Sequence, residues 1–209
     1  MEYDERYEPY FERAGLLAFV RQFSRRPPAI NHTALTALLD RWRPETHSFH
    51  LPCGEMTVTL QDFAMITGLP IDGDALTGRV DNVGWRNRVW GLTGFQPPEP
   101  EEGQRDRRSA GVLYSWLRGL GRCPEPAEEE TVQQYARAYV WYVLARVIFP
   151  DGSGDTASWM WLDPLSDWDA KYSWGAVGLA FLYRQVKTYL HRFCLYVFYN
   201  GISQSDMHG

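Results

Sequence analysis

The stretch from Glu128 to Pro150 predicts the longest helix of this chain. Three successive glutamates open it, where the positive end of a helix dipole favours acidic side chains, and Arg146 lies in the expected last turn. Pro150 ends the pattern, because a proline disfavours helix at the residue before it. Side chains at helical spacing predict the face that turns toward a core: Val132, Tyr135, Tyr139, Tyr142, Val143 and Val147.

Local patterns predict five further helices and one β-hairpin. Apolar residues at helical spacing indicate helices over residues 10–23, 32–43, 60–66, 109–120 and 173–198. Asn31 is a suitable N-cap for the second of these helices, and Thr59 with Asp62 forms a capping-box pattern before the third. Residues 46–60 instead alternate with a period of two around turn residues 52–55, which indicates a hairpin.

These elements predict a mainly α fold of the α+β kind, a compact helical domain with one small β-hairpin. Residues 1–209 are expected to form a single domain, since a chain of this length suits one shared core. The glycine-punctuated residues 71–95 are expected to be more loosely organised, and the Pro-rich acidic residues 96–103 are expected to be a surface loop within the domain. Nine Trp, twelve Tyr and ten Phe provide ample apolar surface for a core, which excludes a disordered chain.

Charge and cysteine content narrow the classes of partner. A net charge of −5 argues against a protein that coats nucleic acid by bulk positive charge, because phosphate contacts need a cationic face. Three cysteines without dense spacing indicate reduced thiols inside the cell. The acidic N-terminal residues 1–5 and the charges within residues 178–199 argue against a signal peptide and a membrane span, so no membrane partner is expected.

One group of potential metal ligands stands out, namely His47, His50 and Cys53, with Glu55 nearby. On a strand His47 and Cys53 share one face, whereas His50 points to the other, so one ion could not collect all three without breaking the hairpin. We therefore expect no metal site, and interpret these residues as a polar hairpin face with a small thiol.

Catalytic motifs are absent from the sequence. It contains no nucleophile elbow, no phosphate-binding P-loop and no dinucleotide-binding glycine motif after a strand. A pyridoxal enzyme would need Lys171 or Lys187 as its Schiff-base amine, because all other basic residues are arginines, and neither lysine follows a glycine-rich phosphate cradle. The acidic group Asp163, Asp167 and Asp169 has no neighbouring histidine, as a metallophosphatase would need. We expect no catalytic residue, no cofactor and no enzymatic activity.

Nucleic-acid binding is an alternative. Residues 59–70 resemble the first helix and turn of a helix-turn-helix unit, but residues 71–74 then bring two carboxylates that would repel phosphate. Other basic candidates are the arginines around Trp85 and Trp90 and those of the following loop: Arg79, Arg86, Arg88, Arg105, Arg107 and Arg108. Binding to DNA is thus possible, but the charge does not support it.

Two blocks of the sequence resemble the plant mobile domain family of maintenance-of-meristems-like proteins. The first block is LLDRWRPETHSFHLPCGEMTVTLQD at residues 38–62, continued by GLPIDG at residues 68–73. The second comprises FPD at residues 149–151, KYSWG at residues 171–175 and LAFLYR at residues 179–184. Such domains are often labelled aminotransferase-like or homologues of a long-form serine/threonine phosphatase 7.

The resemblance implies a non-catalytic nuclear protein-interaction domain with a role in meristem maintenance, transposon and gene silencing and genome integrity. Its implied partner is a phosphatase-like nuclear protein. A transposon-derived DNA-binding module and an aminotransferase-like enzyme are the alternatives. The family-motif residues, structural or interacting, are Trp42, Arg43, Pro44, Glu45, Thr46, His50, Cys53, Gly54, Glu55, Asp62, Gly68, Trp174 and Gly175.

The C-terminal end departs from the family pattern. After about residue 193 the chain lacks the expected Gly-Cys-Leu segment and Trp-containing helix, and it ends in polar residues 200–209. We expect this end to be divergent or truncated, which would expose the apolar face of residues 193–199.

Overall fold

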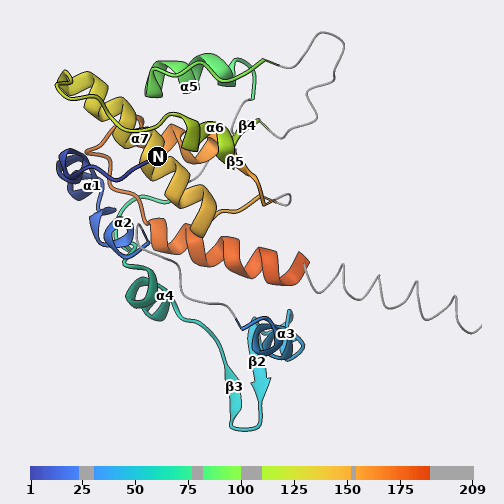
Figure 1. Cartoon of the computed structure of the whole chain (residues 1–209). Helices are drawn as coiled ribbons and strands as arrows, with labels where there is room; N and C mark the ends of the chain where they lie inside the picture. The colour runs from blue at the N-terminus through green and yellow to red at the C-terminus, as the bar shows by residue number, and fades with distance from the viewer. Residues whose placement is uncertain (24–30, 77–81, 100–109, 152–153, 189–209) are drawn as a thin grey trace, which may run out of the picture.

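The computed structural model describes residues 1–23, 31–76, 82–99, 110–151 and 154–188 (Figure 1). The predicted mainly α class is confirmed, because helices dominate the described residues. The β part consists of two small antiparallel sheets, of three and two strands, where one hairpin was predicted. No helix among the described residues is both long and apolar enough to cross a membrane.

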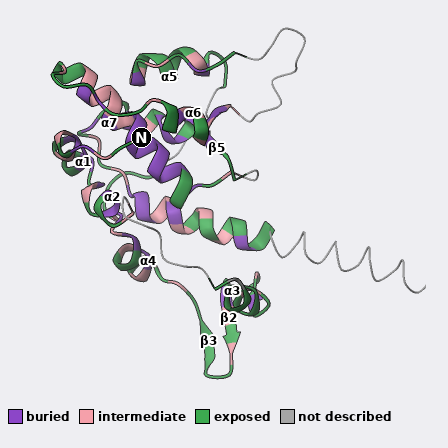
Figure 2. Ribbon diagram, viewed as in Figure 1, coloured by how far each residue is buried: buried purple, intermediate pink, exposed green. Residues whose placement is uncertain are grey.

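Helix α7 (Glu129–Val147) confirms the predicted long helix and is the centre of the core. Residues 138–145 are all buried, so this half of α7 is covered on every side and not along one stripe (Figure 2). The prediction that Val147 faces the core is wrong, because its side chain is exposed. Four helices pack against α7: α1 (Glu8–Arg13), α2 (Leu17–Phe23), α5 (Trp85–Thr93) and α6 (Tyr114–Gly119).

Tryptophan side chains link α7 to the segment that follows it. The indole nitrogen of Trp141 donates a hydrogen bond to the carbonyl oxygen of Ser158 at 2.8 Å. Ser158 ends strand β5 (Thr156–Ser158), which leads into the short 3-10 helices η2 (Trp159–Trp161) and η3 (Asp163–Ser166). The rings of Phe149 and Trp161 stack with centroids 3.7 Å apart. The aromatic content thus serves the core, as the composition indicates.

The first predicted helix is interrupted. A 3-10 turn, η1 (Glu5–Tyr7), precedes α1, and α1 ends before α2 begins at Leu17. Gly15 lies between the two helices with a φ of 72°, a left-handed conformation that glycine adopts without the steric cost that other residues incur. The break turns the chain, so that both α1 and α2 contact α7.

The middle of the chain differs from the prediction in two places. The segment predicted as a helix over residues 109–120 is described from residue 110, and it starts with strand β4 (Gly111–Leu113), which pairs with β5, before α6 begins. The glycine-punctuated segment contains α5, which was not predicted, and its flanking glycines, Gly84 and Gly94, both have a positive φ. These glycines bound a helix, and the strand forms because a partner some 45 residues away supplies its hydrogen bonds.

The segment that carries the first family-like block forms a small subdomain, residues 31–58, which we call the arm. It contains α3 (His32–Leu39), β1 (Trp42–Arg43), β2 (Ser48–Leu51) and β3 (Gly54–Met56), and it extends away from the helical body (Figure 1). The Asn31 N-cap is confirmed by a hydrogen bond from the backbone N–H of Ala34 at 3.0 Å. Helix α3 stops at Leu39, short of the predicted end, because Trp42 and Arg43 pair with β2.

After the arm, the chain returns to the body through α4 (Leu60–Thr67). Its predicted capping box is present, with reciprocal bonds between Thr59 and Asp62, and Gly68 closes the helix with a φ of 71°. The predicted last helix is described over residues 174–188 (Figure 1). Its predicted continuation to residue 198, and the divergent end after residue 193, lie outside the described residues.

Candidate functional site

The family-motif residues fall in three places. The arm holds Trp42, Arg43, Pro44, Glu45, Thr46, His50, Cys53, Gly54 and Glu55. Asp62 and Gly68 lie at the two ends of α4, and Trp174 with Gly175 begins the last helix. The structure brings the end of α4 to the start of the last helix, whereas the arm residues form a separate surface.

The contact between these two ends, which we call the junction, pairs residues 68–74 with residues 171–175. The N–H of Gly175 donates to the carbonyl of Pro70 at 2.8 Å, and the hydroxyl of Ser173 donates to the carbonyl of Ile71 at 2.7 Å. Asp74 accepts from the N–H of Ser173 and donates its own N–H to Lys171. The two family-like blocks therefore meet through the backbone.

Two of the three motif glycines, Gly68 and Gly175, have a steric role at or beside the junction. A Cβ on Gly175 would lie 2.8 Å from the Cγ2 of Ile71, and one on Gly68 would lie 3.2 Å from the backbone of Ala18. Trp174 is buried next to Gly175, with its ring 6.4 Å from that of Phe149. These motif residues are thus structural. The two glycines allow neighbouring segments to approach closely, and Trp174 fills the space beside them.

Tyr183 of the last helix anchors the arm. Its ring lies 5.4 Å from the buried ring of Trp42 and 5.4 Å from that of His47. Its hydroxyl donates to the carbonyl of Val58 at 2.6 Å and lies 3.0 Å from the hydroxyl of Thr57. The arm therefore contacts the body through one aromatic cluster with a polar tip.

His47 has an unusual backbone within this cluster. Its φ of 51° is the one positive value found for a residue other than glycine in the described chain. Its carbonyl accepts from the hydroxyl of Thr57 at 2.6 Å, across the sheet. This bond and the ring contacts with Trp42 and Tyr183 hold a conformation that histidine adopts only at a cost.

The motif carboxylate of Glu55 organises the polar face of the sheet. Its Oε1 lies 2.8 Å from the Nε2 of His50, directly across the β2–β3 pair, and its Oε2 accepts from the hydroxyl of Ser48 at 3.0 Å. Ser48 in turn lies 2.6 Å from the hydroxyl of Thr46. These groups satisfy one another, so they stabilise the hairpin and leave little capacity for a reacting ligand.

The candidate metal ligands have different neighbours. His47 packs against Trp42 and Tyr183, His50 pairs with Glu55, and the sulfur of Cys53 lies 3.8 Å from that of Met56. No group of three or more His, Cys, Asp or Glu in the described part of the chain is placed to hold a metal ion.

Helix α3 presents an apolar face to solvent. A predicted apolar stripe comprises Leu35, Leu38, Leu39 and Trp42. Of these four side chains Trp42 is buried and Leu39 is half-buried. Leu35 keeps 44% of its surface exposed and Leu38 keeps 38%. Helix α3 is exposed over most of its length (Figure 2). We call Leu35 and Leu38 the α3 face; an uncovered apolar stripe on a helix is typical of a docking surface.

The arginines proposed for nucleic-acid contact are already engaged, as far as they are described. Arg86 stacks over the ring of Trp85 at 4.5 Å and donates to the carbonyl of Pro98. Arg88 lies 3.6 Å from the carboxylate of Asp163 and over a ring of η2. Trp90 is exposed. Arg79, Arg105, Arg107 and Arg108 lie outside the described residues.

The lysine and the acidic group considered for catalysis form structural contacts instead. Lys171 donates to the carbonyl of Arg13, and the Arg13 guanidinium lies 2.5 Å from Asp169. That guanidinium holds the pKa of Asp169 below its usual range. Asp167 accepts from the backbone N–H of Asp169. The contacts at Lys171 and Asp169 fasten α1 to the segment before the last helix.

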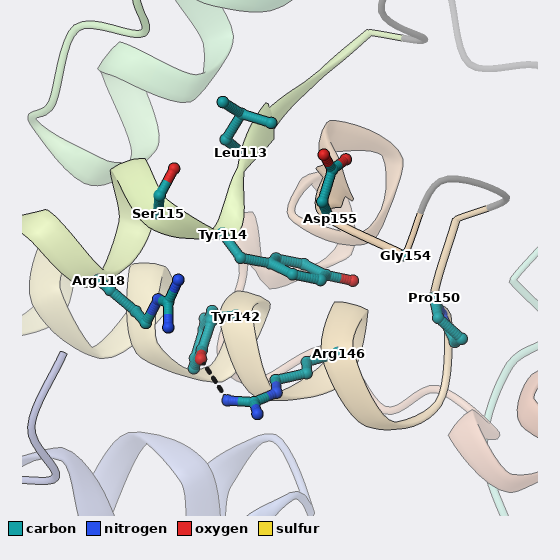
Figure 3. A pocket seen from close by; sticks show the side chains of 9 residues that line it. All are labelled: Leu113, Tyr114, Ser115, Arg118, Tyr142, Arg146, Pro150, Gly154 and Asp155. Carbon is teal, nitrogen blue, oxygen red and sulfur yellow. Dashed lines mark hydrogen bonds between the residues drawn. The ribbon is translucent and has the colours of Figure 1, made fainter.

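A cavity of about 480 Å³ lies between α6, α7 and the start of β5 (Figure 3). Its lining residues are Leu113, Tyr114, Ser115, Arg118, Tyr142, Arg146, Pro150, Gly154 and Asp155. Arg146 donates to the hydroxyl of Tyr142 at 2.6 Å, and burial raises the pKa of Tyr114 to about 12, so that its phenol stays neutral. The sequence analysis missed this site, although Tyr142 and Arg146 lie four residues apart on a predicted helix.

Comparison with known proteins identifies relatives over most of the chain. The family model of the plant mobile domain matches residues 18–205. Protein MAIN-LIKE 1 of Arabidopsis thaliana is 38% identical over 76% of this chain and 31% of its own length. Protein MAINTENANCE OF MERISTEMS from the same plant is 35% identical over 76% of the chain and 33% of its own length.

A third relative, the Serine/threonine-protein phosphatase 7 long form homolog of Arabidopsis thaliana, is 38% identical over 75% of this chain but 12% of its own length. The chain thus spans a third or less of the length of these curated relatives. No solved structure matches the chain significantly.

Proposed function

The chain belongs to the plant mobile domain family, and on that premise we propose that it is a non-catalytic protein-interaction domain that binds its partner through the α3 face. The observation that carries the proposal is the uncovered apolar stripe of α3, at Leu35 and Leu38, on an arm that extends from the body. Full burial of an exposed leucine contributes about 1.5–3 kcal/mol, and Leu35 and Leu38 still expose 44% and 38% of their surface, so covering both contributes about 1–2.5 kcal/mol to docking of a partner helix or strand.

The rest of the arm supports this role. The polar groups of its sheet bond to one another and its aromatic cluster fastens the sheet to the body, so the sheet that follows α3 has a defined position. A partner that meets a preorganised surface loses less conformational entropy on binding than one that meets a flexible segment. Nine of the family-motif residues lie on this arm, which fits a shared recognition element.

The cellular part of the proposal is a nuclear protein that acts in meristem maintenance and in the silencing of genes and transposons. The printed name of one relative, Protein MAINTENANCE OF MERISTEMS, supports the first of these roles. A phosphatase-like nuclear protein is the partner to test first, since another relative carries a phosphatase name.

The experiment compares three tagged forms of the chain in plant nuclei after brief cross-linking. The wild type should recover a phosphatase-like or chromatin protein, and the double variant Leu35→Glu with Leu38→Glu should lose it, because a charge cannot be buried in an apolar contact without a large penalty. The matched control is Thr33→Glu with Ala37→Glu, which adds the same charge to exposed positions on the opposite side of α3.

Equal recovery by all three forms would contradict the proposal, and recovery that disappears after nuclease treatment would favour the DNA-binding alternative. A phosphatase or transaminase activity that co-purifies with the chain at constant specific activity would contradict the non-catalytic part.

A further inference from the structure

Arg118 and Arg146 differ from five other arginines in the described part of the chain. Arg6, Arg13, Arg21, Arg88 and Arg122 each lie within ion-pair distance of a carboxylate. Among the described residues no carboxylate lies within that distance of Arg118 or Arg146, and both side chains line the cavity between α6 and α7. The carboxylate of Asp155 lines the same cavity but is not within ion-pair distance of either arginine. Two cations that face one cavity repel each other, and an anion between them would relieve that repulsion.

We propose that this cavity binds a phosphate monoester group held by Arg118 and Arg146. The two guanidinium groups come from different helices, Arg118 from α6 and Arg146 from α7, and both turn toward the hydroxyl of Tyr142 (Figure 3). Guanidinium groups bind phosphate oxygens through paired charge-assisted hydrogen bonds, which are stronger than neutral ones.

Hydroxyl groups complete the set of donors. The Tyr142 oxygen accepts from Arg146, so its own proton remains available to donate to a ligand oxygen. Ser115 lines the same cavity and offers a second hydroxyl. The Tyr114 hydroxyl, in contrast, donates to the carbonyl of Ala145 at 2.8 Å, so Tyr114 serves as an apolar wall.

The remaining lining residues limit what can carry the phosphate. The cavity volume of about 480 Å³ is larger than the volume that a bare phosphate occupies, and it falls in the range of small-ligand sites. Asp155, which accepts from the hydroxyl of Thr156 at 2.8 Å, also lines the cavity and would repel a second anionic group. We therefore expect a single phosphate on a neutral or cationic carrier, such as a nucleoside monophosphate or a phosphorylated side chain in a basic peptide.

Calorimetric titration of the full chain tests the proposal with three probes: inorganic phosphate, adenosine monophosphate and a basic peptide that contains phosphoserine. The unphosphorylated peptide is the ligand control. Binding should weaken roughly tenfold or more in Arg118→Gln and in Arg146→Gln, since each removes a charge-assisted pair of hydrogen bonds. It should also weaken as the pH falls from 7 to 5, because the second pKa of a phosphate monoester is about 6.

Arg122→Gln is the matched protein control, because Arg122 is exposed, pairs with Glu125 and lies outside the cavity lining. Arg118 and Arg146 are also exposed, so their variants should unfold at the wild-type temperature. Tyr142→Phe gives a second readout, since it removes one donor and no charge. Tighter binding of the nucleotide or of the phosphopeptide would assign the source of the phosphate.

Three outcomes would overturn the proposal. They are no binding of any probe at millimolar concentration, equal weakening in Arg122→Gln, and loss of binding only in variants that also unfold early. None of these outcomes tests binding at the α3 face, so the phosphate-site proposal and the proposed function can be rejected independently of each other.

Discussion

Asp4 shows how a single carboxylate can fix a chain segment. Arg6 donates to it from Nε at 3.0 Å and from Nη2 at 2.6 Å, and the backbone N–H of Arg6 also donates to it. The guanidinium of Arg6 further donates to the carbonyls of Cys123 and Pro124. Asp4 and Arg6 together therefore hold the first residues against the loop that precedes α7.

This geometry has a consequence for pH dependence. Hydrogen bonds from the Arg6 side chain hold the pKa of Asp4 below its usual range, even though burial opposes the shift. A carboxylate with a depressed folded-state pKa stabilises the fold above its unfolded pKa, about 3.9, and this contribution is lost as the pH falls through the folded pKa. Asp4→Asn should thus lower the midpoint of thermal unfolding at pH 7, and the difference from wild type should shrink below pH 4.

Calorimetric scans at pH 7, 5, 4 and 3 would measure that difference. Glu5→Gln is the control, because Glu5 is exposed and makes no ion pair among the described residues. A deficit in Asp4→Asn that is the same at every pH would show that lost packing, and not charge, causes the destabilisation.

At the scale of helices and strands, local signals made some elements predictable and others not. Three helices begin where the sequence predicts, because their start signals depend only on neighbouring residues. These signals are the N-cap of α3, the capping box of α4 and the acidic first turn of α7. Strand β4 was predicted as helix, because its partner β5 lies far along the chain and leaves no local pattern. Helix α5 was not predicted, because glycines such as those that cap it are also typical of irregular segments.

The start of the last helix gives a sharp test of helix packing. Gly175→Ala places a Cβ 2.8 Å from Ile71 and 3.2 Å from the Pro70 carbonyl, so the junction must open. We expect the free energy of unfolding to fall by about 1–3 kcal/mol, as overpacking typically costs. Urea unfolding monitored by circular dichroism would measure it.

Gly91→Ala is the matched control for that substitution. Gly91 lies inside α5 with no atom within 4 Å of its would-be Cβ and no positive φ, so the same change should stabilise the protein by up to about 1 kcal/mol. Equal effects at positions 91 and 175 would contradict the packing argument.

At the scale of the whole molecule, a local pattern predicted the hairpin but not the positions of the candidate metal ligands. The hairpin follows from a period of two. His47 precedes β2 with a φ of 51° and Cys53 lies in the turn between β2 and β3, so strand alternation places neither side chain. The junction depends on segments about 100 residues apart, and the cavity depends on how α6 meets α7. Tertiary packing sets such distances, so periodicity and spacing could not supply them.

A third prediction concerns the hydrogen bond by which Tyr183 attaches the arm to the body. Tyr183→Phe keeps the ring against Trp42 and His47 but removes the hydroxyl that donates to Val58 at 2.6 Å. A hydrogen bond of this kind contributes about 1 kcal/mol, so backbone amides of the arm should exchange hydrogen several-fold faster, while those of α7 should not change.

Hydrogen exchange read by mass spectrometry separates the two regions. Tyr172→Phe is the control, because the Tyr172 hydroxyl has no hydrogen bond among the described residues. Faster exchange throughout the chain would indicate global destabilisation and would contradict a local role for Tyr183 in holding the arm.

The pairing of residues 68–74 with residues 171–175 also bears on biosynthesis. A ribosome that has completed α4 must add roughly 100 more residues before it synthesises residues 171–175, the partner of residues 68–74. Passage through the exit tunnel delays the emergence of residues 171–175 further. During this interval, at about 5–20 residues per second, Pro70, Ile71 and Asp74 cannot form their hydrogen bonds with residues 171–175. Nascent chains stalled before Lys171 should therefore remain protease-sensitive around residue 70, however completely the arm has already folded.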